Sequence, residues 1–171
     1  MRARDIALSG VFAALTAVGA QISVPLGPVP FTFQVLMVFL SGLVLGAKLG
    51  ALSQAIYLLL GALGLPVFAR FSGGIIHIYG PTGGYLLAFP IAAFISGYFS
   101  EKAKTFWGKL GGCLLGLSVI YILGWARLGM WLGMDFKKAF YLGVAPFIVF
   151  DIIKALMALV ISDKIKKALR G

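Results

Sequence analysis

The chain has 171 residues, of which 61% are hydrophobic and 12% are charged, and its mean hydropathy is +1.03. An ordinary soluble domain carries roughly 25% charged residues, so this composition predicts an integral membrane protein. Each spanning helix needs about 20 residues, and six spans would leave only about 50 residues for tails and loops. We therefore predict a single membrane domain over residues 1–171, with no room for a built-in ATPase, a receptor head or a sizeable enzyme.

The net charge of +10 does not indicate a nucleic-acid partner, because the basic residues flank apolar runs and form no cluster on one face. The single cysteine, Cys113, excludes an intrachain disulfide. Arg2 and Arg4 precede the first apolar run, as they would in a signal peptide. We interpret that run as a retained first span, since no polar domain follows it for export.

Charged residues and prolines divide the chain into six predicted membrane-spanning helices. Residues 6–47 carry no charge, and Pro25, Pro28 and Pro30 break this stretch into two spans. Pro90 is expected to kink the fourth span, which membrane helices tolerate. The predicted spans cover residues 5–22, 32–46, 49–64, 84–100, 109–124 and 139–161.

The distribution of Lys and Arg predicts how these spans are oriented. With both termini in the cytoplasm, ten of the 15 basic residues lie inside and four lie outside, while Lys154 falls within a span. The sequence therefore predicts an all-α, multi-pass protein of the cell membrane, with the lipid bilayer as its surroundings and both termini cytoplasmic.

Asp151 and Lys154 form the strongest polar signal in the chain. Asp151 falls near the middle of the predicted span 139–161, and a separation of three places both side chains on one helix face. Burying either ion alone costs at least several kcal/mol, so the pair must face protein or a wet cavity. One interpretation is an ion pair that only helps to pack the bundle. The other is a ligand site for a small neutral group with adjacent N–H and C=O, such as an amide or a urea.

The Gly-rich loop over residues 65–83 is the second signal. Gly73, Gly74 and Gly83 allow the backbone to approach a ligand closely, and the amides that open the following helix favour an anion. Arg70 adds a positive charge nearby. An ordinary outer loop that caps a helix explains the same composition equally well.

Other polar and small residues allow two interpretations each. Thr32 and Gln34 open the second span and either line the same cavity or cap the helix. Ala13 and Ala17 in the first span let another helix come close, either within this bundle or from a second subunit. Several tyrosines could stack on a ligand ring or lie in the membrane interface, namely Tyr57, Tyr79, Tyr85 and Tyr121.

The absence of several motifs argues against ATP hydrolysis, metal binding and proton relay by this chain. The chain has no Walker A sequence, and one histidine with one cysteine excludes a His/Cys metal cluster. Only Asp151 lies deep among the acids, whereas a proton relay normally uses several buried acids or histidines. We therefore predict neither an enzyme nor a protein that carries a metal or other cofactor.

Four segments together resemble the BioY family. They are PVPFTFQ at residues 28–34, LGALGLPVFA at 60–69, GPTGGYL at 80–86 and FDIIKA at 150–155. That family is the biotin-specific substrate-binding S component of energy-coupling-factor (ECF) transporters. The resemblance extends over nearly the whole chain, with the motifs in the right order.

The resemblance implies a six-helix S-component bundle with cytoplasmic termini that binds biotin near the outer surface, under loops one and three. It implies partners as well: a transmembrane T component and two ATP-binding subunits, against which the protein topples to deliver biotin. Asp151 and Lys154 match the family's ligand residues, and Ala13 and Ala17 match its docking face on helix one.

We therefore expect the chain to capture extracellular biotin, with the ureido ring at Asp151 and Lys154 and the carboxylate at the loop amides and Arg70. The alternatives are a stand-alone secondary transporter, an S component for another small vitamin, and a purely structural subunit. The full predicted substrate-binding set is Asp151, Lys154, Thr32, Gln34, Arg70, Gly73, Gly74, Tyr79, Gly83 and Tyr85.

Overall fold

Apolar runs fold as helices along most of the chain, in a computed structural model that describes all residues 1–171. Proline or glycine lies in every connection between helices except that between α5 and α6: proline has no N–H to donate, and several of these glycines have positive φ angles. The elements are α1 (Ala3–Gln21), β1 (Ser23–Val24), β2 (Phe31–Thr32), α2 (Gln34–Leu45), α3 (Ala47–Ala62), the 3₁₀ turn η1 (Ala69–Phe71), α4 (Ile76–Tyr79), α5 (Gly83–Lys102), α6 (Phe106–Trp131), α7 (Phe136–Gly143) and α8 (Ile148–Arg170).

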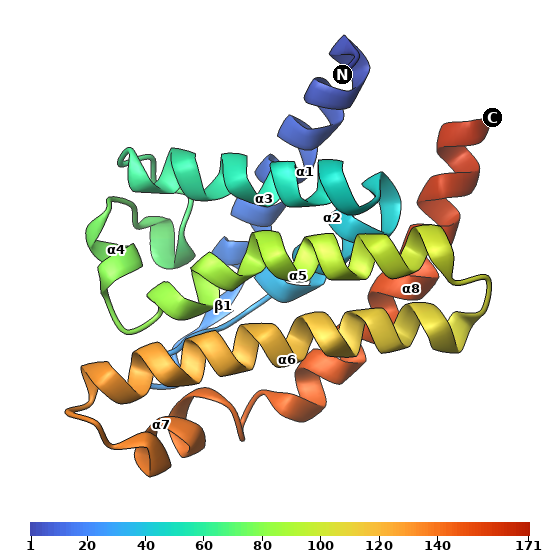
Figure 1. Cartoon of the computed structure of the whole chain (residues 1–171). Helices are drawn as coiled ribbons and strands as arrows, with labels where there is room; N and C mark the ends of the chain where they lie inside the picture. Colours follow the sequence, from blue (N-terminus) through green and yellow to red (C-terminus); the bar gives the residue numbers. More distant parts are fainter.

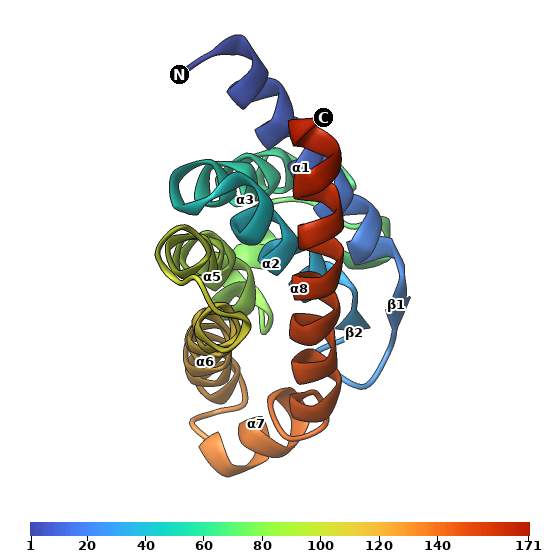
Figure 2. The same ribbon diagram turned by 90° about the vertical axis from the view of Figure 1, so that its right-hand side faces the viewer.

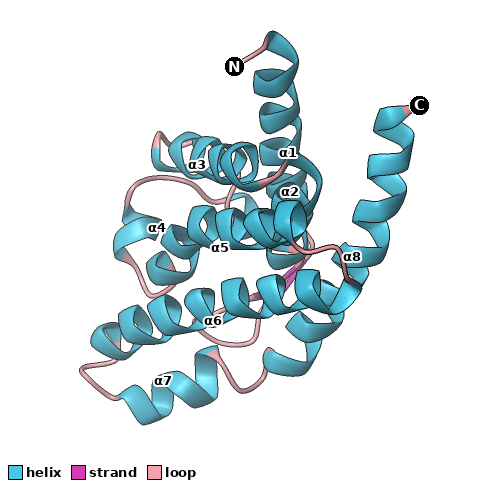
Figure 3. Ribbon diagram, turned by 45° about the vertical axis from the view of Figure 1, so that its right-hand side comes forward, coloured by secondary structure: helices cyan, strands magenta, loops and turns pink.

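The helices form two layers around a shared core. Helices α3, α5 and α6 run side by side in one layer, and α1 and α8 lie on the other side of the short helix α2 (Figures 1 and 2). Buried side chains form two apolar clusters, one around Tyr57 and Phe89 and the other around Phe39 and Leu159. Both chain termini project from the same end of the molecule (Figure 3).

Three helices, α1, α5 and α6, are long and apolar enough to cross a membrane, and α7 with α8 makes a fourth candidate. Helices α2 and α3 are also apolar but have only 12 and 16 residues, short of the ~20 that a straight span needs. The structure is therefore that of a helical protein with several membrane spans. Six spans stay a prediction.

The last predicted span is not one helix. The expected continuous helix over residues 139–161 is divided into α7 and α8, which meet at 47° across a break that contains Pro146. Proline has no N–H to donate, which explains a helix end at this point. The prediction that Asp151 lies at mid-helix is therefore wrong, because it lies in the first turn of α8. Pro90, by contrast, sits inside an unbroken α5.

A short hairpin connects α1 to α2. Strands β1 and β2 pair antiparallel over only two residues each, Ser23 with Thr32 and Val24 with Phe31. Three prolines between them lack the donors that would lengthen the ladder, and Gly27 turns the chain with φ +95°. The hairpin is therefore short, and residues 23–32 are called the strap below.

Glycines allow α2, α3 and α5 to pack closely. Gly46 joins α2 to α3 with φ +86°, and the Glu101 carboxylate accepts the Ala47 N–H at 2.9 Å across this turn. A Cβ at Gly42 or Gly97 would overlap backbone atoms of the facing helix. The backbones of these three helices therefore approach one another closely.

Candidate functional site

A cavity with a volume of about 570 Å³ is bounded by several parts of the chain. These are the hairpin strap, the start of α2, the segment between α3 and α5, the first half of α5, the second half of α6, the α7–α8 break and the first two turns of α8. Small-molecule sites typically have about 300–1,000 Å³, so the cavity has room for a vitamin-sized ligand.

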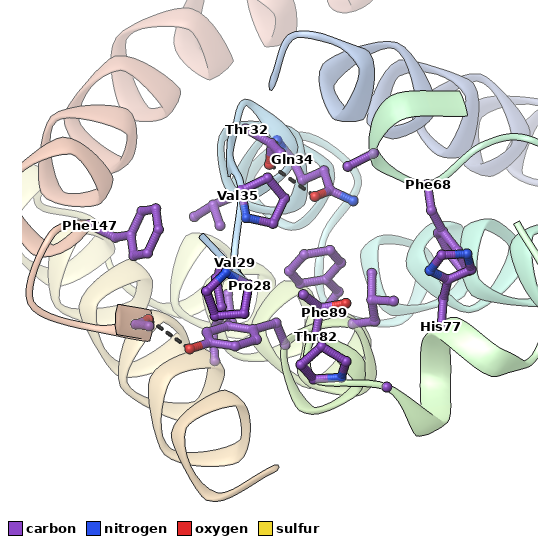
Figure 4. A pocket seen from close by; sticks show the side chains of 18 of the residues that line it. Pro28, Val29, Thr32, Gln34, Val35, Phe68, His77, Thr82, Phe89 and Phe147 are labelled. Atoms are coloured by element: carbon purple, nitrogen blue, oxygen red, sulfur yellow. Dashed lines mark hydrogen bonds between the residues drawn. The ribbon is translucent and has the colours of Figure 1, made fainter. Parts of the chain in front are cut away.

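The walls of the cavity are mainly apolar. Phe68 and His77 lie on one side, with ring centroids 5.9 Å apart, and Phe147 lies on the other (Figure 4). Phe89 and Val29, which belongs to the strap, lie between these two walls (Figure 4). Such walls favour the rings and methylene groups of a ligand over water.

Asp151 and Lys154 make a buried ion pair that faces this cavity. The Lys154 Nζ lies 2.9 Å from the Asp151 Oδ1, and each residue is only 4% exposed. The ammonium also donates to the Thr32 carbonyl at 2.6 Å, and it lies 4.2 Å from the centroid of the Phe31 ring. The ion pair is thus compensated by further contacts, which buried charges need, and it joins α8 to the strap.

Tyr121 of α6 completes the polar group. Its hydroxyl donates to the Asp151 Oδ2 at 2.5 Å. Each Asp151 oxygen therefore accepts one protein hydrogen bond and keeps further lone pairs, so the carboxylate can still accept an N–H from a ligand. Beside it, Lys154 supplies a donor. The pair can hold one edge of a group that presents N–H next to C=O.

Thr32 and Gln34 belong to a hydrogen-bonded chain that crosses the cavity wall. The Thr32 hydroxyl donates to the Gln34 Oε1 at 2.9 Å (Figure 4), and the Gln34 Nε2 donates to the Tyr57 hydroxyl at 2.6 Å. Tyr57 then donates to the Val67 carbonyl at 3.0 Å. The Thr32 Oγ1 also accepts the Gln34 N–H at 3.2 Å. Thr32 therefore lines the cavity and accepts the first N–H of α2, while Phe33 holds the N-cap position.

Arg70 lies on the rim of the cavity and makes no ion pair in the structure. It has φ 60°, and the next residue, Phe71, has φ 53°, an uncommon conformation for residues other than glycine. Gln21 at the end of α1 holds this turn: its Oε1 accepts the Phe71 N–H at 2.7 Å, and its Nε2 donates to the Phe68 carbonyl at 3.0 Å. The conformation of the rim therefore depends on α1.

Tyr85 is the sixth predicted residue that lines the cavity, with Asp151, Lys154, Thr32, Gln34 and Arg70. Its hydroxyl donates to the Gly143 carbonyl at 2.7 Å, so it also ties α5 to the end of α7.

Four predicted site residues lie outside the cavity lining. A Cβ at Gly73 would overlap the Leu65 carbonyl, so Gly73 packs the loop against its own backbone, and the Gly74 N–H donates to the Gly61 carbonyl at the end of α3. Gly83 opens α5, and Tyr79 is 69% exposed. The structure therefore does not place these four residues in the cavity with Asp151 and Lys154.

The structure also adds residues that the sequence analysis did not assign to a site. The sequence does not distinguish Tyr121 from the three other tyrosines. Its hydrogen bond to Asp151 joins residues 30 positions apart on different helices. Phe31 lies against the Lys154 ammonium, and His77 lines the far wall of the cavity. Nothing in local spacing identifies these three residues.

The predicted docking pair on α1 faces the bundle. Ala13 is only 2% exposed, and Ala17 packs against the same core cluster. The outward face carries other small residues, because Ala7 and Ala14 are exposed and a Cβ at Gly10 would meet nothing within 4 Å. If a second subunit packs against α1, this outward face is available and the Ala13 face is not.

Comparison with known proteins places the chain in one family. The BioY family model matches residues 1–171. A "Probable biotin transporter BioY" from Pyrococcus horikoshii is 56% identical over 97% of this chain and 98% of that protein. A "Biotin transporter BioY" from Thermotoga maritima is 49% identical over 96% of each.

A solved structure supports the same assignment. The crystal structure of "the S-component for biotin from an ECF-type ABC transporter" matches with a TM-score of 0.88 at 28% identity. The match covers 96% of this chain and 91% of that one. With matches in sequence and in structure that extend over nearly its whole length, the chain belongs to the BioY family.

Proposed function

We propose that this chain is the biotin-binding S component of an ECF transporter, a transport protein and not an enzyme. The names of its relatives and its structural neighbour support this function. The observation that carries it is the buried Asp151–Lys154 pair in the apolar cavity of about 570 Å³. Biotin has a ureido ring, a fused sulfur ring and an aliphatic acid tail, and the cavity offers a matching surface for each.

The ureido ring is proposed to lie against the ion pair. Asp151 accepts a ureido N–H, and Lys154 donates to the ureido oxygen, each as a charge-assisted hydrogen bond. Phe89 and Phe147 then contact the rings and the methylene groups. The carboxylate reaches the rim, where Arg70 has no other anionic partner. Gly73, Gly74, Tyr79 and Gly83 are left out of this proposal because they do not line the cavity.

The transport cycle needs partners that this chain does not contain. The sequence has no Walker A motif, so ATP hydrolysis belongs to other subunits. We propose a T component that packs on α1 and two ATP-binding subunits, with this chain in the cell membrane, six spans and both termini cytoplasmic. Ten of the 15 Lys and Arg residues lie on the side of the protein that carries both termini, which supports that orientation.

Calorimetric titration of biotin into the detergent-purified protein tests the function directly. Saturable heat with biotin and none with thiamine or riboflavin is the expected result. Heat with one of the other vitamins would identify an S component of different specificity. Ion-dependent uptake of biotin into liposomes that contain this chain alone would instead support a secondary transporter.

Tyr121→Phe is expected to weaken biotin binding about tenfold or more, because a hydrogen bond to a charged group contributes about 1.5–3 kcal/mol. The phenol holds the Asp151 Oδ2 in place, and the ring remains in the variant. Tyr98→Phe is the control, because Tyr98 is exposed and does not line the cavity. Equal affinities for the two variants would show that Tyr121 does not orient the carboxylate.

A further inference from the structure

A second cavity, of about 370 Å³, lies at the end of the bundle that carries both termini. It is bounded by the first turns of α1, the α2–α3 junction and the last turns of α8. It shares no lining residue with the first cavity. Biotin binding as proposed above therefore makes no use of it.

The charged lining of this cavity is strongly positive. Arg2, Arg4, Lys166 and Arg170 face it, and Asp5 is its only acid. Asp5 is already neutralised locally, since its Oδ2 accepts the Arg2 N–H at 3.0 Å and lies 3.6 Å from the Arg2 Nε. A net positive charge remains to attract an anion.

The cations keep donors for a ligand. Arg4 donates only to the Leu169 carbonyl, at 3.5 Å, and Lys166 donates to the Ser100 hydroxyl at 2.7 Å. A guanidinium has five N–H donors and an ammonium has three, so most of them are unused. Arg170 makes no ion pair or side-chain hydrogen bond in the structure. This donor set suits a phosphate group.

The rest of the lining is apolar. Leu8, Val44, Leu45, Leu49 and Leu169 lie beside the four cations in the same cavity. A free phosphate would gain nothing from these side chains, whereas a phospholipid would place its glycerol and the start of its acyl chains there. Basic pockets between membrane helices commonly bind anionic headgroups.

We propose that this cavity is a binding site for an anionic phospholipid, with the phosphodiester held by Arg4, Arg170 and their neighbours and the acyl chains against the leucines. The lipid bridges α1 to α8, two helices that the chain itself joins there only by the Arg4–Leu169 hydrogen bond. The site is independent of biotin binding.

Retained lipid, measured by native mass spectrometry after exchange into phosphatidylglycerol or phosphatidylcholine, tests the proposal. Phosphatidylglycerol is expected to stay bound to the unmodified protein, and Arg4→Gln with Arg170→Gln is expected to reduce its retention about tenfold or more. Lys137→Gln with Lys138→Gln removes the same charge from exposed positions of α7 and is expected to leave retention unchanged. Circular dichroism checks that each variant is folded.

Three outcomes would overturn the proposal. Equal loss of lipid from both double variants would indicate attraction by net charge alone. Displacement of the lipid by millimolar inorganic phosphate or glycerol 3-phosphate would indicate a site for a soluble anion. Normal lipid retention together with loss of co-purifying T component would identify the cavity as a protein-docking surface.

Discussion

Asp151→Asn is expected to weaken biotin binding by about 100-fold or more. The amide has nearly the same shape, but it removes the charge that pairs with Lys154 at 2.9 Å. The ammonium, 4% exposed, then lies in the protein without an anionic partner. Hydrogen bonds to charged groups contribute about 1.5–3 kcal/mol each, and breaking a buried pair costs about 3–5 kcal/mol. Calorimetric titration of biotin into the purified variant measures the loss.

Asp163→Asn is the matched control on the same helix. Asp163 is exposed and lies 3.7 Å from Lys109, a surface pair of the kind that contributes about 0–1 kcal/mol. Its biotin affinity is expected to equal that of the unmodified protein. Unchanged affinity for Asp151→Asn would remove Asp151 from the binding site.

The double variant Asp151→Asn with Lys154→Met separates binding from packing. If the pair only packs the bundle, replacing both charges leaves folding, binding and uptake intact. On the proposed function, the double variant folds, because no charge is left unpaired, but it does not bind biotin. Gel filtration and titration of the same sample give the two readouts.

Gly10→Leu with Ala14→Leu is expected to spare biotin binding and abolish co-purification with the T component. Both positions face outward on α1, and a side chain added at Gly10 meets nothing in this protein. Small residues four apart let membrane helices approach closely, and two leucines would hold a partner helix away. The measurement is recovery of the T component with tagged protein from membranes that contain both.

The control for this pair is Gly111→Leu with Ser118→Leu on α6. A Cβ at Gly111 also meets nothing within 4 Å, and Ser118 is exposed. This variant adds comparable apolar bulk to another lipid-facing surface and is expected to retain the complex. Ala13→Leu is a poor test of docking, because overfilling a buried position typically costs about 1–3 kcal/mol and disturbs the fold itself.

Hydropathy and proline positions are enough to locate most helices in this chain. The prolines between residues 25 and 30 mark the strap because a missing N–H ends a helix wherever no neighbour compensates. The presence of a proline does not by itself predict a break. Helix α5 continues through Pro90, whereas the last predicted span breaks near Pro146. Tertiary packing decides between these outcomes. The sequence therefore does not predict that Asp151 lies in the first turn of a helix.

The orientation of α1 shows a second limit. Small residues lie on both its buried and exposed faces, so the alanines do not indicate which side faces a neighbour. Ala13 and Gly10 are equally plausible from spacing alone, and only the packed bundle distinguishes them.

Sequence spacing predicts contacts between site residues only where the residues belong to one helix. A separation of three places Asp151 and Lys154 together on any α-helix, and the structure has them in contact. Tyr121 and Phe31 reach that pair through the arrangement of α6 and the strap, which no local pattern encodes. The glycines of the loop fit a cradle for a ligand and a tightly packed turn equally well, and here Gly73 packs against backbone.

Gln21 connects the rim of the cavity to the helix that carries the proposed docking surface. Its amide binds the carbonyl of Phe68 and the N–H of Phe71 on the cavity rim, while the outward face of its own helix is the proposed docking surface. A shift of α1 must carry the rim with it or break these bonds. Energetic coupling between two sites is reciprocal, so a docked subunit that loosens biotin is itself loosened by biotin to the same degree. On this coupling, an empty chain competes better than a loaded one for a T component whose docking loosens biotin.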